Sequence, residues 1–335
     1  MAKLDRVAGL PQRRFALPER FRAVGQTYGA LAVLLLLVLY NLVFTPSFRT
    51  LAALNLNLTQ VATTVIVATG MTLVIATGGI DLSVGSLMAI AGALAPMLFS
   101  RNLPLFNIPV LGTVLAWLVP IGVAGLFGLF NGMLVTTFRI QPIIATLILY
   151  VGGRGIAQVA TSGNIQNFKN PAFQVIGLAR PLGIPVQVIL MLVIVAIAAW
   201  VMRATIFGRY VLAIGGNEPA ARLAGVPVAR IKRMVYVISG LLAGLAGLIV
   251  IAINSSSDAN RVGLGMELDA IAAVAVGGTP LTGGRATIGG TLIGALIIQL
   301  IRSTLLSKGV PFAVAQIVIA GIILLAVYVQ RQRKV

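Results

Sequence analysis

The sequence predicts an all-α integral membrane protein of about ten transmembrane helices, with broken helices and an internal repeat. Of its 335 residues, 59% are hydrophobic and 10% are charged, whereas an average soluble domain is about a quarter charged. The apolar residues occur in runs of roughly twenty, the length that a helix needs to cross a hydrocarbon layer of about 30 Å. A glycine-rich segment in the first third of the chain recurs in the last third. These observations define the fold class.

The apolar runs give the predicted helices in order. Residues 31–43 and 188–201 are almost unbroken apolar stretches, which favours helices over the alternating segments of about ten residues in a membrane β-barrel. Ten such runs place both termini on one side of the membrane. The predicted runs are residues 28–45, 51–77, 80–100, 109–137, 142–161, 184–202, 234–253, 267–279, 284–302 and 311–329.

The basic residues orient these helices. With both termini in the cytoplasm, most of the 25 Lys and Arg residues fall in inside segments, as the positive-inside rule requires. We therefore predict a multi-pass protein of the cell (cytoplasmic or inner) membrane. It has a cytoplasmic basic tail at residues 1–27, a transmembrane domain at residues 28–330 with a cytoplasmic loop at 203–233, and a cytoplasmic tail at 331–335.

The composition excludes several kinds of chemistry. A net charge of +18 would point to nucleic acid in a soluble protein, but here the charges lie in short loops, so we expect membrane lipid and no nucleic acid. The chain has no Cys and no His, which removes thiolate chemistry and the commonest general base and metal ligand. We predict no catalytic residue, no metal site and no cofactor.

Residues 74–94 (VIATGGIDLSVGSLMAIAGAL) and 273–296 (AVAVGGTPLTGGRATIGGTLIGAL) resemble each other. We interpret them as an internal repeat whose helices break near mid-membrane, as transporter helices often do. The alternative is that small residues recur because they let helices pack closely, as on the face formed by Gly240, Gly244 and Gly247. The predicted topology makes the repeats parallel, and a re-entrant segment in either half would make them inverted. At one constant offset, the alignment pairs Gly78, Gly79, Leu82, Ser83 and Gly85 with Gly277, Gly278, Leu281, Thr282 and Gly284.

Asp81 is one of seven acidic residues and follows a glycine pair in an apolar region. A carboxylate near the membrane centre costs roughly 2.5 to 3.5 kcal/mol on insertion scales, so it must have a compensating role. The Asp-Leu-Ser spacing of Asp81 and Ser83 suits capping of the helix that follows, and we favour this interpretation. The alternative is direct contact of both side chains with a polar solute in a membrane pathway.

A second polar stretch, residues 254–261 (NSSSDANR), precedes Glu267 and Asp269 and is assigned to the outer side. Asp258, Asn260 and Glu267 are candidates for a pathway mouth or for the docking of an external protein. A solvated loop would have the same composition. Arg154 follows two glycines in the fifth run and either pairs with a buried carboxylate or marks a membrane boundary.

The cytoplasmic loop at 203–233 is longer than a simple connection needs, which indicates contact with a partner. We predict two short helices separated by residues 225–227, with Glu218 and a proline in a first turn. Attraction of a basic loop to anionic lipid headgroups is the alternative. The predicted contact residues are Gly215, Asn217, Glu218, Ala220, Ala221, Arg222 and Gly225.

Three motifs together resemble the permeases of carbohydrate ABC importers of the ribose type: GGIDLSVG at 78–85, G-x-N-x-x-A-A-x-x-A-G-V at 215–226, and GG-x-x-L-x-GG at 277–284. Residues 139–149, 153–158 and 258–270 are most similar to the galactofuranose permeases within that family. The resemblance covers the chain from about residue 50 to its end. Pro280 and Ala286 depart from the serine and glycine usual at those positions, which puts local geometry in doubt.

This resemblance implies a transport subunit that is not itself an enzyme. Its implied partners are a second permease chain in a homo- or heterodimer, a cytoplasmic ATP-binding subunit and an extracytoplasmic sugar-binding protein. No G-x-x-x-x-G-K-[ST] motif occurs, so ATP hydrolysis must belong to another chain. An ion-coupled secondary transporter is the main alternative, although intramembrane carboxylates for an ion relay are few. A membrane enzyme and a channel are weaker alternatives, and the sequence does not select the sugar.

Overall fold

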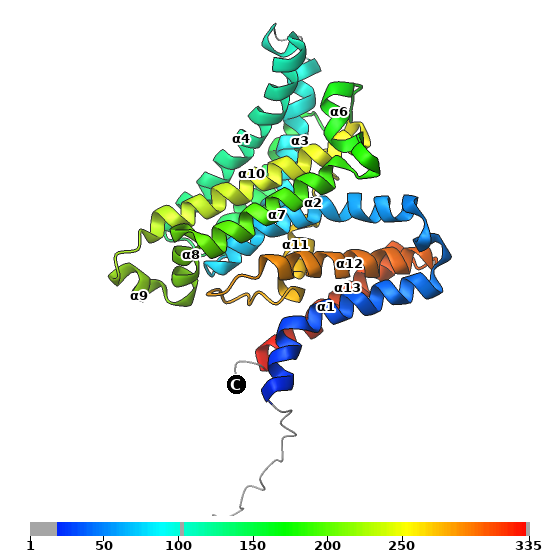
Figure 1. The fold of residues 1–335 in the computed structure, drawn as a ribbon. Helices are drawn as coiled ribbons and strands as arrows, with labels where there is room; N and C mark the ends of the chain where they lie inside the picture. The colour runs from blue at the N-terminus through cyan, green and yellow to red at the C-terminus, as the bar shows by residue number, and fades with distance from the viewer. Residues whose placement is uncertain (1–18, 101–103, 333–335) are drawn as a thin grey trace, which may run out of the picture.

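The computed structural model describes residues 19–100 and 104–332, which are almost entirely helical (Figure 1). Loops and turns connect the helices. The β-structure of the described residues is one short ladder, in which β1 (Gln166–Asn167) pairs antiparallel with β2 (Ser256–Ser257). The all-α class is therefore confirmed apart from this short ladder. The helices are α1 (Glu19–Phe44), η1 (Pro46–Arg49), α2 (Leu51–Ala76), α3 (Val84–Ser100), η2 (Pro104–Asn107), α4 (Pro109–Thr136), α5 (Pro142–Ala160), α6 (Pro171–Leu178), η3 (Pro181–Gly183), α7 (Val186–Ala204), α8 (Ile206–Gly216), α9 (Glu218–Leu223), α10 (Val228–Asn254), α11 (Met266–Val276), α12 (Ile288–Ser307) and α13 (Phe312–Gln332).

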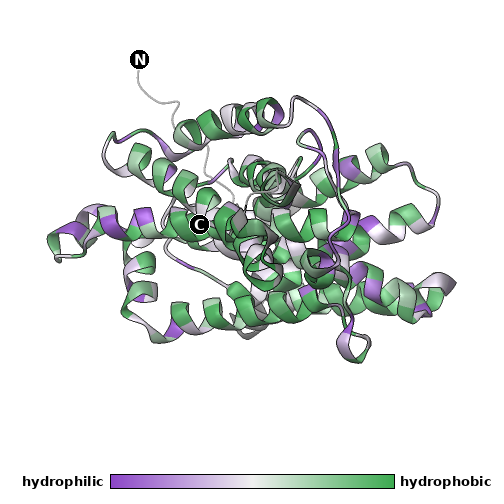
Figure 2. Ribbon diagram, turned by 90° about the horizontal axis from the view of Figure 1, so that it is seen from above, coloured by the Kyte–Doolittle hydropathy of each residue, from purple (hydrophilic) through white to green (hydrophobic). Residues whose placement is uncertain are grey.

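Each predicted apolar run overlaps one helix. In the described part of the chain, six helices are long and apolar enough to cross a membrane, namely α2, α4, α5, α7, α10 and α12. The other predicted spans overlap α1, α3, α11 and α13, whose described apolar stretches are shorter. Hydrophobic residues cover the helices, and hydrophilic ones gather at helix ends and connections (Figure 2). The fold is that of a membrane protein, and the number of about ten spans stays a prediction.

The predicted tail boundaries differ from the helix ends. Residues 1–18 and 333–335 of the predicted tails lie outside the described residues, whereas residues 19–27 and 331–332 belong to α1 and α13. A helix continues beyond the apolar layer wherever its backbone hydrogen bonds continue. Apolar runs therefore mark the membrane section of a helix and not its full length.

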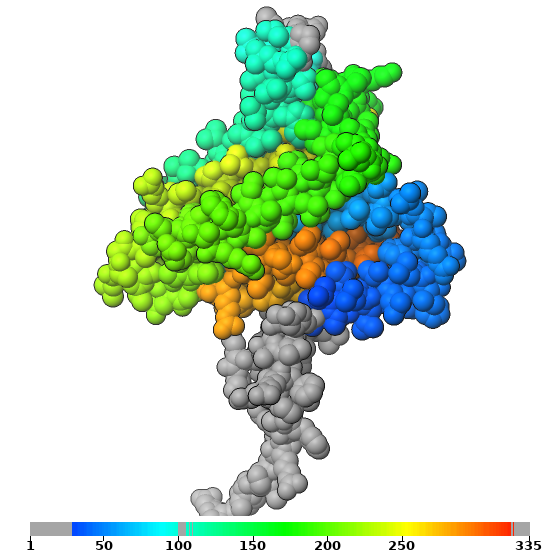
Figure 3. All heavy atoms as spheres, in the orientation of Figure 1, coloured from blue at the N-terminus to red at the C-terminus, as the bar shows by residue number. Residues whose placement is uncertain are grey.

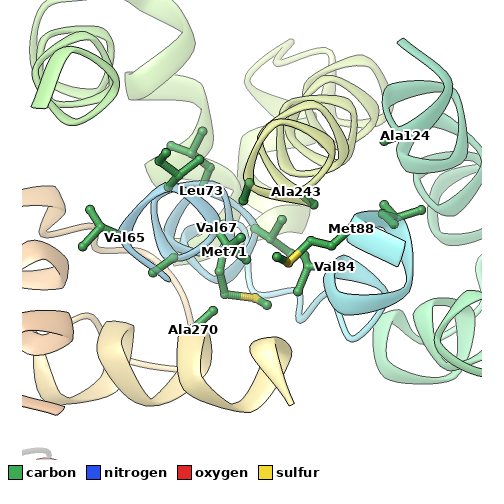
Figure 4. Close-up of a cluster of buried hydrophobic side chains, with 14 of the residues drawn as sticks. Val65, Val67, Met71, Leu73, Val84, Met88, Ala124, Ala243 and Ala270 are labelled. Carbon is green, nitrogen blue, oxygen red and sulfur yellow. The ribbon is translucent and has the colours of Figure 1, made fainter. Parts of the chain in front are cut away.

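Helix α2 is the centre of the packing. In its most apolar window 78% of the residues are buried, against 28% in α5 and in α7. Met71 of α2 lies among Met88 of α3, Ala243 of α10 and Ala270 of α11, whereas Val65 points from the opposite side of α2 (Figure 4). A helix that is apolar on all sides must be enclosed by other apolar helices or by lipid. Here the other helices enclose it.

The small-residue face of α10 packs inside the chain, as predicted. A Cβ atom added at Gly240 or at Gly244 would collide with Ala124 of α4, and one at Gly247 would meet the backbone of Met88 in α3. The facing helix contributes Gly128, where an added Cβ would overlap the carbonyl of Tyr236. Glycines on both helices therefore let α4 and α10 approach at backbone distance.

Both repeats form a helix, a glycine turn and a second helix. Helices α2 and α11 end two residues before Gly78 and Gly278, whose φ angles are 80° and 87°. The two turns share their hydrogen bonds: Gly79 N donates to Val74 O at 3.1 Å and Thr279 N to Val274 O at 3.2 Å. This is the left-handed helix end that favours glycine. The repeat is thus visible in the backbone.

The predicted alignment of the repeats is wrong by one position. It paired Gly78 with Gly277, whereas the turn geometry pairs Gly78 with Gly278. Each turn needs one glycine with positive φ, and this is the first glycine of the first pair but the second glycine of the second pair. Matching the glycine pairs as letters therefore shifts the register.

The repeats run in the same direction, as predicted. Helices α2 and α12 are antiparallel, because Thr72 shares a hydroxyl hydrogen bond of 2.8 Å with Thr291 while Gln299 Nε2 donates to Gln60 Oε1 at 2.6 Å. Helices α11 and α12 are also antiparallel, since the contacts of Gly277 with Gly290 and of Ala273 with Gly294 run in opposite order. It follows that α2 and α11 are parallel.

The α4–α10 contact yields a stability prediction. Gly128→Ala should lower the thermal stability of the purified protein by about 1–3 kcal/mol, because the added methyl group overlaps the Tyr236 carbonyl and overpacking costs that amount. Gly122→Ala on the same helix is the matched control, since an added Cβ there meets nothing within 4 Å. Melting curves in detergent measure both variants. Equal melting temperatures for the two would contradict the packing argument.

Candidate functional site

Asp81 is fully buried in the turn between α2 and α3. Its Oδ1 accepts hydrogen bonds from Ser83 N at 3.0 Å and Ser83 Oγ at 2.6 Å, and its Oδ2 accepts one from Ser239 Oγ of α10 at 2.8 Å. Ser83 Oγ accepts a further bond from Asn131 Nδ2 of α4 at 2.8 Å. Both carboxylate oxygens are thus occupied by this chain. The arrangement supports the structural role of Asp81 over contact with a solute.

Side chains also satisfy the other backbone groups of this turn. Leu82 N donates to Thr146 Oγ1 of α5 at 3.1 Å. Ser83 O accepts from Leu87 N at 2.9 Å, the first hydrogen bond of α3, and from Ser86 Oγ at 2.7 Å. Buried backbone groups in a turn between packed helices require such partners. The first break is therefore held by α4, α5 and α10 together.

The second break uses threonines in place of a carboxylate. The hydroxyls of Thr279 and Thr287 share a hydrogen bond of 2.8 Å, and Thr287 N donates to Thr279 Oγ1 at 3.0 Å. Thr287 Oγ1 also donates to Gly277 O, at the end of α11, at 3.0 Å. The hydroxyl groups that close this turn are neutral, so the hydrogen-bonded closure buries no charge.

Asp258 and Asn260 lie in the loop between β2 and α11. Asp258 Oδ1 accepts from Asn260 N at 2.9 Å, which folds the loop, and Gln158 Nε2 of α5 donates to Asn260 Oδ1 at 2.7 Å. Arg261 reaches Asp258 only at 3.8 Å, with an exposed side chain, and such surface pairs contribute little. The loop is therefore attached to α5 through an amide pair.

Arg154 fastens the same loop. Its Nη1 donates to Ala259 O at 2.9 Å and to Val262 O at 3.1 Å, and its Nη2 donates to Gly85 O in α3 at 3.3 Å. Its hydrogen bonds go to backbone carbonyls and connect α5, the loop and α3. Its charge also interacts with that of the buried Glu267, which agrees with the predicted pairing to a buried carboxylate, whereas the carbonyl contacts were not predicted.

Glu267 is buried in the first turn of α11. A Cβ added at Gly85 would meet its Oε2 at 2.5 Å, so Glu267 lies against the first turn of α3. The structure thus divides the predicted pathway residues into two groups. Asp81 and Ser83 form the group inside the bundle; Asp258, Asn260 and Glu267 form the group around the loop. The groups adjoin at the first turn of α3.

The predicted contact residues of the cytoplasmic loop come together on α8 and α9. Asn217 separates the two helices and caps α9, because its Oδ1 accepts from Ala220 N at 3.0 Å. Glu218 and Pro219 form the first turn of α9, as predicted. The prediction that residues 225–227 separate two short helices is wrong: the separation is at Asn217, and the helix after residue 227 is the long α10. Basic side chains interrupt the apolar run there, but they do not interrupt the helix.

Glu218 joins α9 to α10. Its carboxylate pairs with Arg222 at 3.0 Å, as the spacing predicted, and with Lys232 of α10 at 2.5 Å. Partial burial would raise the pKa of Glu218, but the hydrogen bond and charge of Lys232, followed by those of Arg222, outweigh it and hold the pKa below its usual value. The stabilisation is therefore present at neutral pH and is lost as the pH falls through that lowered pKa.

The end of α8 touches both helix breaks. A Cβ at Gly215 would overlap Ala76 O, the last carbonyl of α2, and would meet Gly284 N at 2.5 Å. Gly284 N donates to the same Ala76 O at 3.0 Å, and a Cβ at Gly283 would meet Gly78 N at 2.8 Å. We call Gly78, Gly215, Gly283 and Gly284 the glycine junction. Nothing in the sequence pairs these positions, since they lie in three separate segments.

Exposure on α9 differs from what the small residues suggested. Ala221 is 6% exposed and faces the protein, and Gly225 has a φ of 80° that any other residue would strain. Leu223, between them, is 91% exposed. It was missed because one leucine on a six-residue helix gives no periodic pattern.

Three further side chains of the site were also missed. Ser239 of α10 lies next to the small residues that we interpreted as a packing face. A hydroxyl among such residues indicates a hydrogen-bond partner inside the protein. Asn131 is an isolated amide in an apolar run, which was a usable signal for hydrogen bonding inside the bundle. Lys232 pairs with Glu218 across a turn of the chain, and no local spacing indicates that contact.

An apolar helix bundle with two parallel helix–turn–helix repeats is typical of a membrane transport protein. The chain belongs to the family described as the permease component of branched-chain amino acid transport systems, whose profile matches residues 54–327. It is therefore a permease component and not an enzyme.

Individual relatives cover most of the chain. It is 44% identical over 279 residues to the galactofuranose transporter permease protein of Escherichia coli K12, covering 82% of this chain and 79% of that protein. It is 42% identical over 310 residues to the ribose import permease protein of the same strain, covering 91% and 94%. The ribose import permease protein of Bacillus subtilis 168 is 42% identical over 318 residues, covering 93% and 95%. The resemblance to ribose-type permeases is confirmed. No solved structure matches the chain.

The Asp81 cluster yields a prediction that separates cap from ligand. Asp81→Ala should lower thermal stability by about 1–3 kcal/mol for each hydroxyl left buried without its acceptor, and transport should fall with it. Asp258→Ala is the control for stability alone, because its carboxylate lies in a loop and is partly exposed. Melting curves and uptake are measured on the same preparations. Unchanged stability with a higher solute requirement would instead make Asp81 a solute ligand, and no change in either would remove it from the mechanism.

Proposed function

We propose that the chain is the permease subunit of an ATP-binding cassette importer for a monosaccharide such as galactofuranose or ribose. The observation that carries this proposal is 42–44% identity, over most of the chain, to relatives named as galactofuranose and ribose permeases. The binding motif for ATP phosphates is absent from the sequence, so a separate chain hydrolyses ATP. The permease supplies the pathway.

The proposed assembly contains a second permease chain, a cytoplasmic ATP-binding subunit and an extracytoplasmic sugar-binding protein. Both termini of the permease lie in the cytoplasm, and about ten spans cross the membrane. Pairing of two permeases is supported by the scarcity of free polar groups within one chain: the buried Asp81 and Ser83 already bind each other and their neighbours. One chain offers too few groups to enclose a hydrated sugar.

The proposed pathway mouth is the loop group of Asp258, Asn260 and Glu267. Two features support it. Glu267 Oε2 is buried and accepts no hydrogen bond from the described residues, and Asn260 is exposed at the loop surface. Arg154 and Gln158 hold this loop in one conformation, so its polar groups are positioned in advance. Asp81 and Ser83 act in the pathway indirectly, by holding the start of α3.

The α8–α9 segment is the proposed contact for the ATP-binding subunit. Leu223 projects from it fully enough to enter a partner groove, in the way that an apolar helix side chain anchors a helix in a groove. Behind it, the glycine junction connects α8 with both helix breaks. A force on α9 is therefore transmitted by direct contact to the end of α2 and to both turns.

ATP-dependent uptake tests the proposed function as a whole. The complex, reconstituted in liposomes with its sugar-binding protein, should accumulate sugar only with hydrolysable ATP, and the ATP-binding subunit should co-purify with the permease. Sugar uptake driven by an ion gradient without ATP would identify a secondary transporter. Passive, non-saturable flux would identify a channel.

The exposed leucine gives a prediction for partner binding. Leu223→Ser should reduce co-purification of the ATP-binding subunit and slow uptake at least about tenfold, since loss of a buried anchor costs 2 kcal/mol or more. Leu182→Ser is the matched control, because Leu182 is equally exposed but lies in η3, away from α9. Both variants should insert normally. If Leu223→Ser keeps full association, α9 is not the contact, and attraction of the basic loop to lipid becomes the better explanation.

The glycine junction gives a prediction for coupling. Gly215→Ala should keep the ATP-binding subunit attached but uncouple ATP hydrolysis from uptake, because the methyl group separates α8 from Ala76 and Gly284. Gly216→Ala is the matched control, since a Cβ at the adjacent glycine meets nothing within 4 Å. The ratio of sugar transported to ATP hydrolysed measures the effect. Equal ratios in the two variants would show that the junction transmits no motion.

A further inference from the structure

A groove lies between α1, α2 and α12, apart from both groups of candidate pathway residues. Its volume is about 410 Å³, within the range of about 300–1,000 Å³ of ligand pockets. Its walls are aliphatic, formed by Leu34 and Val38 of α1, Leu54 and Leu58 of α2, and Leu296 and Leu300 of α12. In Figure 3, α1 and the start of α2 lie over the orange α12 at one end of the molecule. The groove fits a long apolar ligand.

The polar atoms at this groove are largely occupied within the chain. Gln299 Nε2 donates to Gln60 Oε1 at 2.6 Å, and Asn57 Nδ2 donates to Ala53 O at 2.9 Å. A sugar would have to replace such bonds to gain hydrogen bonds of its own. An alkyl chain makes no such demand, so the lining selects against the proposed transport substrate and for a hydrocarbon.

Two cations stand at the end of α1 beside this groove. Arg49, which lines the groove, donates from Nε to Leu42 O at 2.7 Å and from Nη2 to Val43 O at 3.2 Å. Lys308 Nζ donates to Phe44 O at 2.6 Å. A guanidinium has five N–H donors and an ammonium has three, so both keep donors for an anion. The carbonyls that end α1 hold the two cations in place.

We propose that this groove binds one anionic phospholipid, with an acyl chain between α1, α2 and α12 and the phosphate on Arg49 and Lys308. The aliphatic groove matches the acyl chain of such a lipid, and the cations at its end match the phosphate. Arg suits phosphate because its fork donates to two oxygens. The bound lipid fills the space between α1 and the bundle.

Native mass spectrometry of the purified, delipidated complex tests the site with dioleoyl phosphatidylglycerol as the probe. The complex should retain one lipid per permease chain and bind phosphatidylcholine less tightly. Arg49→Gln should weaken retention measurably, because it removes a guanidinium that donates charge-assisted hydrogen bonds to the phosphate. Arg261→Gln, which removes an exposed cation outside the groove, is the charge control and should change nothing.

A second pair of variants tests the groove independently of charge. Leu54→Trp should fill the groove and abolish retention, whereas Leu56→Trp, exposed on the same helix but outside the lining, should retain the lipid. Equal retention in both Trp variants would overturn the proposal. So would equal binding of phosphatidylcholine, or dissociation of the permease pair by Leu54→Trp, which would make the groove a contact between subunits.

Discussion

Where a tight turn joins two packed helices, the buried backbone N–H and C=O groups outside the helices must find partners within the protein, and this chain has two such turns, between α2 and α3 and between α11 and α12. The surrounding structure follows from that constraint. At the first turn, Asp81 and Thr146 supply the missing partners, Ser239 of α10 donates to Asp81, and Asn131 of α4 donates to Ser83. Helices α4, α5 and α10 must therefore pack around residues 77–83 for the turn to form. The bundle therefore packs around these turns.

Close helix approach is the second requirement, and glycine provides it. Helix α10 meets α4 and α3 at glycines that admit no side chain, and this contact brings Ser239 within 2.8 Å of Asp81. Glycine in a helix costs roughly 0.5–1 kcal/mol relative to alanine. That cost is repaid here by backbone contact over long helices and by a buried carboxylate whose oxygens are both hydrogen-bonded. The close packing of α10 and the hydrogen bonds of Asp81 therefore depend on each other.

Sequence reasoning recovered what depends on local pattern. It gave the membrane class, a helix for each apolar run, the parallel broken repeat, the cap-like spacing of Asp81 and Ser83, and the Glu218–Arg222 pair. It failed where partners are remote or where backbone angles decide: the repeat register, the separation at Asn217, the carbonyl contacts of Arg154 and the exposure of Leu223. Hydropathy records which residues tolerate lipid, and it contains no information about which helix lies next to which.

Two physical routes connect α9 with the first helix break, and they converge. One passes from α8 through Gly215 to the last carbonyl of α2. The other passes through the Glu218–Lys232 pair into α10, whose Ser239 binds Asp81. A displacement of α9 relative to α2 would have to open the glycine junction, and one that carried α10 with it would also have to break the hydrogen bond between Ser239 and Asp81. That hydrogen bond is buried and the junction is in backbone contact, so intermediate positions are costly. These contacts therefore join α8, α9, α10 and the end of α2 into one unit, and a displacement of α9 reaches residues 77–83 directly.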